Sequence, residues 1–423
     1  MSAIQRFTKA NGTPAGDNTN IMHMDAVRPP FERIALILSG GGALGSYQAG
    51  VYQALAERNL HPDWVAGISI GAVNAALIAG NPPERRVDRL REFWETVSGP
   101  PSGVRYFAGL KIHDSFRRIV NHGRSLDALL RGAPGFFKLR VPPPYLHQNS
   151  RLETLSYYDV TPLKSTLGRL VDFDLINAGA TRFTACAVNV RTGNVVPFDN
   201  TTCQICPEHV MASGSLPPAL PTIKIGSEYY WDGGLVSNTP LQWVLDTPPR
   251  KDTLAFQVDL WNACGDLPGN FVESEVREKD ILFSSQTRMA TEQFKKRQIL
   301  RRAAAKLLAK MPRELLQTPE AETLAAEADE KVHNVIQLSY RKHYTGNFKD
   351  YEFSRSTMEE HWKSGYRDAV RTLRHPEVLQ RPSGGDGFFT FDLARDGQTH
   401  RDLPMADASG YADHRLLAVS GAD

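Results

Sequence analysis

The sequence predicts an α/β domain with a mostly parallel central sheet, and three observations lead to this prediction. Short uninterrupted apolar runs, such as residues 34–38 and 64–66, are typical of buried strands in a parallel sheet. Glycine-rich turns follow both runs directly, where a chain that leaves a strand must turn sharply. A helical pattern follows each turn, so the order is strand, glycine loop, helix, strand, tight turn, helix.

The first helix of this unit is indicated by apolar residues at spacings of three and four, namely Tyr47, Val51, Tyr52 and Leu55. The second helix continues through Ile78 and ends at Asn81-Pro82-Pro83. Residues 64–83 carry no charge, a length that calls for comparison with a membrane span. Asn74 and the glycines of the tight turn argue against a span, so we expect this stretch to form buried core.

Later elements follow from the same kinds of pattern. Apolar or alternating runs predict strands at 183–190, 195–198, 228–231, 254–258 and 335–338. Helical periodicity predicts a long helix from about residue 280 to 310 and another over 357–373. One face of the long helix is apolar and carries Leu300, Ala304, Leu307, Leu308 and Met311.

The glycine loop at residues 40–45 permits two interpretations. Its glycines satisfy the Gly-x-Gly-x-x-Gly pattern of dinucleotide-binding loops. That interpretation requires an acidic residue at the end of the second strand to bind a ribose hydroxyl. Here the strand ends in Gly67-Ile68-Ser69, and the nearby acid, Asp63, precedes it. We therefore favour an oxyanion-binding loop, because exposed N–H groups bind a tetrahedral oxyanion as well as a phosphate.

Ser69 lies at the centre of Gly67-Ile68-Ser69-Ile70-Gly71, a pattern that predicts a nucleophile elbow. Its usual setting is a triad completed by an acid and a histidine. Asp232, however, ends an aromatic strand and precedes two glycines, where its carboxylate can reach a serine directly. The histidines that follow Asp232 could complete a triad in principle, but their contexts are typical of ordinary structural positions: His333, His343, His361 and His375.

The glycine loop, Gly-x-Ser-x-Gly and Asp-Gly-Gly, in that order, resemble the motifs of the patatin-like phospholipases. The resemblance extends to residues 211–217 and 238–240 and covers about residues 33–260. It implies a three-layer α/β/α hydrolase domain in which Ser69 is the nucleophile and Asp232 the base, without histidine. It further implies that the oxyanion loop consists of Gly40, Gly41, Gly42 and Gly45. The elbow glycines would be Gly67 and Gly71, and the supporting motif glycines would be Gly233 and Gly234.

The implied activity is hydrolysis of lipid acyl esters through a covalent serine ester. Asp232 would accept the proton of Ser69 and later activate water. Because an exposed aspartate has a pKa of about 3.9 and is a poor base at neutral pH, burial near Tyr230 and Trp231 should raise its pKa. Many family members carry Arg or Lys where this chain has Leu44, so any charge assistance from that side chain is absent. The alternatives are an esterase or thioesterase acting on non-membrane acyl substrates, including storage polyesters, or a lipid-binding module with a vestigial site.

Composition limits the other possibilities. The chain has 423 residues and a net charge of +2, which gives no global reason to expect nucleic acid. Cys203-x-x-Cys206 with His209 nearby lacks the second close pair of a zinc site, so we expect no metal and no cofactor. The four cysteines are expected to be reduced thiols in a cytoplasmic protein.

The chain is expected to divide into four parts. Residues 1–30 are polar, have no apolar signal core, and should be disordered. The hydrolase domain should span 31–262, a mainly helical C-terminal extension 263–380, and a flexible tail 381–423. Residues 351–356, with 360–362, resemble the extension of a bacterial patatin-like subgroup.

Two segments carry further hypotheses. Residues 100–158 contain aromatic residues and prolines, and form either a lid or acyl-chain wall, or an irregular segment packed on the sheet. The long helix has a basic side that fits peripheral contact with an anionic membrane at the inner face. This side consists of Lys295, Lys296, Arg297, Arg301, Arg302, Lys306 and Lys310. The alternative is a solvated face paired with the acids that follow, which are Glu320, Glu322, Glu327, Asp329 and Glu330.

Overall fold

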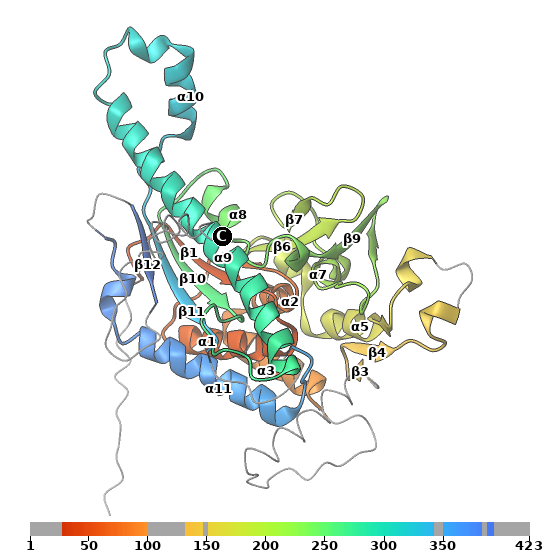
Figure 1. Ribbon diagram of the computed structural model, residues 1–423. Helices are drawn as coiled ribbons and strands as arrows, with labels where there is room; N and C mark the ends of the chain where they lie inside the picture. Colours follow the sequence, from red (N-terminus) through yellow and green to blue (C-terminus); the bar gives the residue numbers. More distant parts are fainter. Residues whose placement is uncertain (1–27, 100–131, 147–150, 342–349, 383–386, 393–423) are drawn as a thin grey trace, which may run out of the picture.

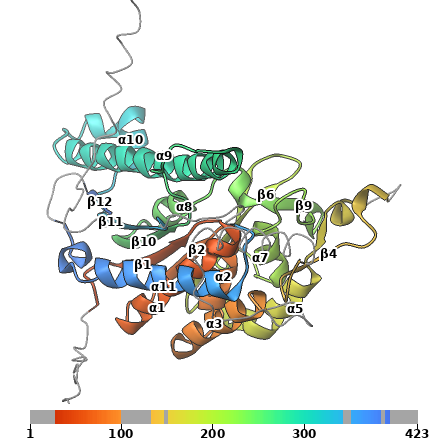
Figure 2. The ribbon, with the colours of Figure 1, turned by 60° about the horizontal axis from the view of Figure 1, so that its bottom comes forward.

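The computed structural model describes residues 28–99, 132–146, 151–341, 350–382 and 387–392. Within these ranges one nine-stranded sheet forms the central layer, and helices lie on both of its faces (Figures 1 and 2). Its strands are β1 (Arg33–Leu38), β2 (Trp64–Gly67), β6 (Arg182–Asn189), β7 (Val195–Asp199), β8 (Ile223–Ile225), β9 (Glu228–Asp232), β10 (Thr253–Asp259), β11 (His333–Ser339) and β12 (Phe388–Phe391).

The sheet is mostly parallel, as the sequence predicts. Its order is β12-β11-β10-β1-β2-β6-β9-β8, and β7 pairs with β6 outside this path. The strands from β12 to β6 run parallel, whereas β7, β8 and β9 add antiparallel pairs at one side. Leu38 at the end of β1 pairs with Gly67 at the end of β2. The glycine loop and the serine turn therefore leave the sheet at the same edge.

Helices complete a three-layer α/β/α arrangement, which confirms the predicted fold class. Figure 2 shows α1 and α11 on one face of the sheet and α8 and α9 on the other. The helices are α1 (Ser46–Glu57), α2 (Ile70–Ala79), α3 (Arg86–Val97), α5 (Thr161–Leu170), α6 (Phe173–Asn177), α7 (Pro207–Ser213), α8 (Leu241–Asp246), α9 (Phe271–Leu308), α10 (Pro319–Glu327) and α11 (Arg355–Thr372). A small second sheet holds β3 (Gly132–Ala133), β4 (Phe137–Leu139) and β5 (Tyr158–Asp159).

The uncharged stretch at residues 64–83 forms β2 and α2, and every residue of α2 is buried. The expectation that it belongs to the core is therefore confirmed. Among the helices that the structure describes, none has both the length and the apolarity needed to cross a membrane.

The C-terminal region is joined closely to the rest of the sheet. Helix α11 packs against α1 so tightly that a Cβ atom at Gly50 would lie 1.9 Å from the carbonyl oxygen of Trp362. A Cβ atom at Gly365 would likewise lie 2.0 Å from the carbonyl oxygen of Tyr47. Strands β11 and β12 continue the sheet beyond β10. The boundary predicted between residues 262 and 263 stays a prediction, and strands from both sides of it share one sheet.

The tail predicted to be flexible from residue 381 contains β12, whose residues pair in parallel with β11. For Phe388–Phe391 that prediction is wrong, because the edge of β11 offers backbone partners that sequence composition does not reveal. Residues 1–27, in the segment predicted to be disordered, and residues 393–423 lie outside the described residues.

The long helix α9 starts earlier than predicted and buries another face. It begins at Phe271, after Asn270 caps its N-terminus by accepting a hydrogen bond from the N–H of Glu273. The apolar face indicated by the sequence is not the buried one, because Leu300 is 69% exposed and Leu307 is 55% exposed. The face that is buried carries mostly polar residues at spacings of three and four, namely Ser284, Thr287, Thr291, Phe294, Gln298 and Arg301.

Polar partners on the body of the protein explain this orientation. The hydroxyl of Thr287 lies 2.7 Å from that of Thr239. The side-chain amide of Gln298 donates to the carboxylate of Asp329 at 2.6 Å. Since buried polar groups require partners, the helix turns its hydrogen-bonding face inward and leaves its leucines exposed.

Candidate active site

The turn between β2 and α2 presents Ser69 in a strained backbone conformation. Ser69 has φ 56° and ψ −125°, and it directly precedes the first residue of α2. A Cβ atom at Gly67 would lie 2.3 Å from the backbone of Gly71, and one at Gly71 would lie 2.3 Å from the carbonyl oxygen of Leu38. Both flanking positions therefore require glycine for steric reasons, as expected for a nucleophile elbow.

Ser213 accepts hydrogen bonds from the backbone of this turn. The N–H of Ser69 donates to the carbonyl oxygen of Ser213 at 3.1 Å and to its hydroxyl at 3.0 Å. The Ser213 hydroxyl in turn donates to the carbonyl oxygen of Cys186 at 2.6 Å. Hydrogen bonds to Ser213 at the end of α7 thus fix the strained backbone, and Ser213 is itself bonded to β6.

Asp232 ends β9 and lies beside the serine. Its side chain accepts a hydrogen bond from the N–H of Gly234 at 2.7 Å, and the Ser69 side chain lies close enough to lower its pKa. Gly233 packs so closely on β6 that a Cβ atom there would lie 2.4 Å from the carbonyl oxygen of Cys186. The Asp-Gly-Gly turn therefore fixes the carboxylate against the elbow.

Burial gives Asp232 the pKa that a general base requires. Loss of solvation raises the pKa of Asp232 to about 6, although the nearby Ser69 side chain and the hydrogen bond from Gly234 act in the opposite direction. The side chain is buried, and among the described residues it forms no ion pair. The expectation that burial raises this pKa is confirmed, and a carboxylate with this pKa is largely ionised yet basic near neutral pH.

The glycine loop offers unused N–H donors next to Ser69. The carbonyl oxygen of Gly40 accepts hydrogen bonds from Trp261 Nε1 at 2.8 Å and from Asn238 Nδ2 at 3.4 Å. In a planar trans peptide, the N–H of Gly41 must then point to the opposite side. Within the part of the chain that the structure describes, the N–H groups of Gly40, Gly41 and Gly42 donate no hydrogen bond.

Gly45 has a different surrounding from the other loop glycines. Gly40, Gly41 and Gly42 line the cavity that contains Ser69, whereas Gly45 is not among its described lining residues. A Cβ atom at Gly45 would lie 2.6 Å from the side chain of Ile70 and 2.9 Å from that of Trp94. The absence of a side chain at Gly45 therefore serves packing between the loop and its neighbours. Leu44, which stands where the sequence analysis expects a basic residue in many family members, is fully buried.

An apolar cavity of about 140 Å³ opens onto the serine and the aspartate. Its polar groups come from the loop glycines and from side chains that include Ser69, Asp232, Asn238, Lys279 and Asp350. Most of the wall is hydrocarbon or aromatic, and includes Phe136, Phe137, Leu163, Val210, Leu216 and Phe353. The aromatic rings pack on one another, with Phe136 and Phe353 centroids 5.8 Å apart. This lining suits an acyl chain, because its burial removes apolar surface from water.

Part of the segment predicted as a lid or acyl-chain wall belongs to this lining. Phe136 and Phe137 form one side of the cavity, which supports the wall hypothesis for these residues. Tyr145 is exposed and does not contribute. Residues 100–131 lie outside the described residues, so the lid hypothesis stays a prediction.

The histidines considered for a triad occupy other sites. No histidine is among the described residues that line the cavity. His333 is buried beside Phe294, and burial lowers its pKa to about 3. His361 packs against Tyr340, and His375 lies at the surface next to Glu377. His343 lies outside the described residues.

The paired cysteines form a local contact. The N–H of Cys206 donates to Nδ1 of His209 at 3.0 Å, and the Cys206 sulfur lies 3.1 Å from the same atom. This contact caps the first turn of α7. In the described ranges, no group of three potential metal ligands occurs.

Several residues at this site have no strong sequence signal. Asn238 lies in residues 238–240, which share the family resemblance, but its contact with Gly40 follows only from the structure. Trp261, Lys279 and Tyr351 reach the cavity from distant parts of the chain. Isolated residues of this kind cannot be recognised from spacing, because their neighbours are set by tertiary packing.

Comparisons with known proteins match most of the described chain to one family. A family model described as patatin-like phospholipase matches residues 36–245, and one described as patatin phospholipase matches 281–384. Triacylglycerol lipase SDP1L of Arabidopsis thaliana is 38% identical over 101 residues, which are 24% of this chain and 12% of that protein. Patatin-like phospholipase domain-containing protein 7 of Rattus norvegicus is 47% identical over 58 residues, 14% of this chain and 4% of that protein.

The matched parts are small portions of these relatives, since the chain spans 12% of the first and 4% of the second. Among solved structures, VipD from Legionella pneumophila aligns with a TM-score of 0.37 and 16% identity. That alignment covers 81% of this chain and 67% of VipD, and a score this low carries no conclusion about activity.

Proposed function

This chain belongs to the patatin-like phospholipase family, and from that premise we propose that it hydrolyses lipid acyl esters through a dyad of Ser69 and Asp232. The observation that carries the proposal is the close approach of these two side chains in one apolar cavity. A serine beside a buried carboxylate, with free N–H donors alongside, meets the requirements of acyl transfer.

In the first half of the reaction, Ser69 Oγ attacks the carbonyl carbon of the ester while Asp232 accepts the hydroxyl proton. Negative charge develops on the former carbonyl oxygen, and the free N–H groups of Gly41 and Gly42 are the proposed donors to it. Collapse of the tetrahedral intermediate breaks the bond to the alcohol oxygen, which takes the proton from Asp232. The acyl group remains on Ser69.

In the second half, water attacks the acyl-enzyme while Asp232 accepts one of its protons. The tetrahedral intermediate then breaks the bond to Ser69 Oγ, which recovers the proton from Asp232. A carboxylic acid is released and both side chains return to their starting state. The cavity wall would hold the acyl chain in both halves of the reaction, because the apolar residues Leu163, Val210 and Phe353 line the same cavity as Ser69.

Labelling with a fluorophosphonate tests the nucleophile directly. Ser69 Oγ should form a bond to phosphorus and displace fluoride, so the protein should be labelled at Ser69 and inhibited. Ser69→Ala should abolish both labelling and hydrolysis. Ser237→Ala is a suitable control, because Ser237 lies near the Asp-Gly-Gly turn but donates to the carbonyl oxygen of Thr239. Labelling that survives in Ser69→Ala would contradict the proposal, and no labelling at all would favour a vestigial site.

The substrate class needs a separate measurement. Turnover of micellar phospholipid should exceed turnover of short soluble esters, since a long acyl chain can fill the apolar cavity. Comparable rates on phospholipid and triacylglycerol would indicate that the head group is not recognised. Preference for soluble thioesters or storage polyesters would support the alternative function instead.

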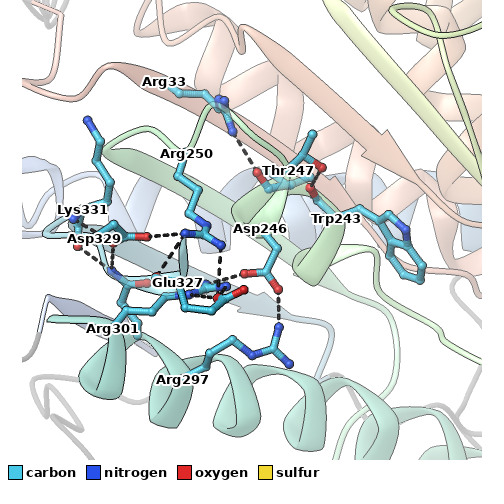
Figure 3. A network of polar contacts seen from close by, with 12 residues as sticks. Arg33, Trp243, Asp246, Thr247, Arg250, Arg297, Arg301, Glu327, Asp329 and Lys331 are labelled. Atoms are coloured by element: carbon cyan, nitrogen blue, oxygen red, sulfur yellow. Dashed lines mark hydrogen bonds and ion pairs between the residues drawn. The ribbon is translucent and has the colours of Figure 1, made fainter. Parts of the chain in front are cut away.

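The proposal includes peripheral contact with an anionic membrane, through a smaller surface than the sequence indicated. Arg297 and Arg301 bind Asp246, and Arg301 also binds Glu327 (Figure 3). Arg302 donates to backbone carbonyl oxygens of residues 330 and 331. These three arginines therefore face the body of the protein, which agrees with the alternative of pairing with acids.

Lys306 and Lys310 are exposed beside Leu300 and Leu307 at the far end of α9, where cationic and apolar groups together suit a lipid surface. Each lysine near such a surface contributes about 1 kcal/mol. The double change Lys306→Gln and Lys310→Gln should therefore weaken binding to anionic vesicles about 30-fold and leave soluble-ester turnover unchanged. Lys363→Gln, on α11 at the opposite face, is the control. Unchanged vesicle binding in the double variant would contradict membrane contact.

A further inference from the structure

We infer that the C-terminal region positions the oxyanion loop through an ion pair between Lys279 and Asp350, an inference that rests on the proposed function. Lys279 lies in the third turn of α9, and Asp350 lies shortly before α11. Both belong to the C-terminal part of the chain, far in sequence from the loop that they support. Lys279 and Asp350 act as positioning residues, because their effect reaches the reaction through the glycine loop.

The backbone of Asp350 touches two successive residues of the loop. Its carbonyl oxygen accepts a hydrogen bond from the N–H of Ala43 at 2.9 Å. Gly42 has φ 56°, and a Cβ atom there would lie only 2.3 Å from the same oxygen. The loop therefore adopts its conformation against this carbonyl group. A displacement of residue 350 would move the peptide next to the N–H of Gly42, one of the proposed oxyanion donors.

The side chain of Asp350 is held in turn by Lys279. The Lys279 ammonium lies 2.7 Å from the Asp350 carboxylate, whose side chain is only 14% exposed. The ammonium also lies 5.4 Å from the centroid of the Tyr351 ring, within the range of a cation–π contact. An ion pair with a mostly buried carboxylate is less screened by solvent than a pair at the surface. Removal of Lys279 would leave this carboxylate without its counter-charge and favour its movement toward water.

The same groups line the catalytic cavity. Lys279, Asp350 and Tyr351 share it with Ser69 and Asp232, as does Phe283 one turn further along α9. Because Lys279 lines the cavity, its alternative role is to contact the substrate directly. The two roles differ in kinetics, because misplaced oxyanion donors lower kcat, whereas a lost contact to bound substrate raises KM.

The experiment measures kcat and KM on a short soluble ester, together with the rate of Ser69 labelling by a fluorophosphonate. Lys279→Met should lower kcat and the labelling rate about 10-fold, with KM changed by less than about two-fold. Lys279→Arg, which retains the charge, should restore most of both rates. The double variant Lys279→Met with Asp350→Asn should be no slower than Lys279→Met alone, because the two residues act as one unit.

Lys331→Met is the matched control. Lys331 forms an ion pair with Glu32 at the same distance, 2.7 Å, and its side chain is 34% exposed against 37% for Lys279. This pair connects the C-terminal part of the chain with the N-terminal part, and neither residue lines the cavity. Lys331→Met should therefore keep the wild-type kcat and labelling rate.

Three outcomes would overturn the inference. These are wild-type rates in Lys279→Met, a change confined to KM, or an equal loss of rate in Lys331→Met. Failure of the proposed function looks different, because the wild-type protein itself would then not be labelled at Ser69. Melting temperatures of all variants, measured alongside, separate a loss of rate from a loss of folded protein.

Discussion

Asp232 in the cavity and Arg301 on the inner face of α9 are both buried charged residues, but only one has counter-charges. Asp232 forms no ion pair with any described residue, and burial raises its pKa to about 6. Arg301 lies 2.5 Å from Asp246 and 2.8 Å from Glu327 (Figure 3). Burial lowers the pKa of Arg301, but its hydrogen bonds to these carboxylates outweigh burial and raise it.

In the proposed mechanism, this difference separates a carboxylate that takes part in the reaction from a guanidinium that stabilises the structure. A buried carboxylate without a cation can exchange its proton near neutral pH, because neither charge state is strongly favoured. A buried guanidinium between two carboxylates is held in one charge state and one orientation, and it connects α9 with α8 and with the segment before β11. Asp259 refines the comparison, since burial also raises its pKa to about 6, but its partners are Gln257 and Thr239.

The largest expected effect concerns the catalytic base. Asp232→Asn keeps the size of the side chain but removes proton acceptance, so kcat should fall by about three to four orders of magnitude. Wild-type Asp259 has an equally raised pKa but no described contact with Ser69. Asp259→Asn should therefore retain most activity. Steady-state turnover of a soluble ester measures both. If Asp259→Asn were as inactive as Asp232→Asn, the raised pKa rather than the serine contact would mark the site.

The histidines provide a second control for that comparison. Alanine at His361 or His375 should leave most activity, as should alanine at His333 in the folded fraction, because none of these residues lines the cavity. We expect the same for His343. A histidine variant as inactive as Asp232→Asn would indicate a triad in place of the dyad.

The Arg301 network should govern stability and leave chemistry intact. Arg301→Met removes the cation from two carboxylates and should lower the free energy of unfolding by about 3 kcal/mol. Arg297→Met is the matched control, since Arg297 binds the same Asp246 but its side chain is 51% exposed. It should cost less than about 1 kcal/mol. Urea denaturation measures both, and equal costs would mean that burial of the guanidinium is not the decisive factor.

The pH dependence of turnover sharpens the assignment of the base. Asp232 accepts a proton only when it is ionised, and its pKa is about 6. We therefore expect kcat on a soluble ester to fall about 10-fold per pH unit below this pKa. The same inflection should persist in Asp259→Asn, since Asp259 takes no part in the reaction. An inflection that disappears in Asp259→Asn would contradict the assignment to Asp232.

The free energy of unfolding should change with pH in the direction opposite to turnover, because of the same carboxyl group, Asp232. The folded-state pKa of Asp232, about 6, exceeds its ordinary value of 3.8, so stability is lost as pH rises through this interval. Asp232→Asn should therefore raise the free energy of unfolding by about 3 kcal/mol at pH 8, and by only about 0.5 kcal/mol at pH 4. Unfolding curves at both pH values test this prediction. A destabilised Asp232→Asn at pH 8 would mean that the interaction with Ser69 outweighs the cost of burying the charge.

The local parts of the site were predictable from the sequence because their requirements are local. A tight turn after a strand needs glycine at Gly67 and Gly71, and the serine between them must project outward. The apolar runs of β1, β2, β10 and β11 likewise indicate buried parallel strands, since each run reports its own burial. Asp232 could be found because the Asp-Gly-Gly turn accompanies it in sequence.

Only the tertiary structure decided which distant groups meet. The sequence indicated an apolar face on α9, but the partners Thr239, Asp246 and Asp329 made the polar face the buried one. It also gave no indication that Lys279 and Asp350 lie beside the glycine loop, or that β12 extends the sheet. Such contacts depend on free energies summed over segments separated by tens to hundreds of residues. Residue spacing encodes the periodicity of one element, but it does not encode the neighbour against which that element packs.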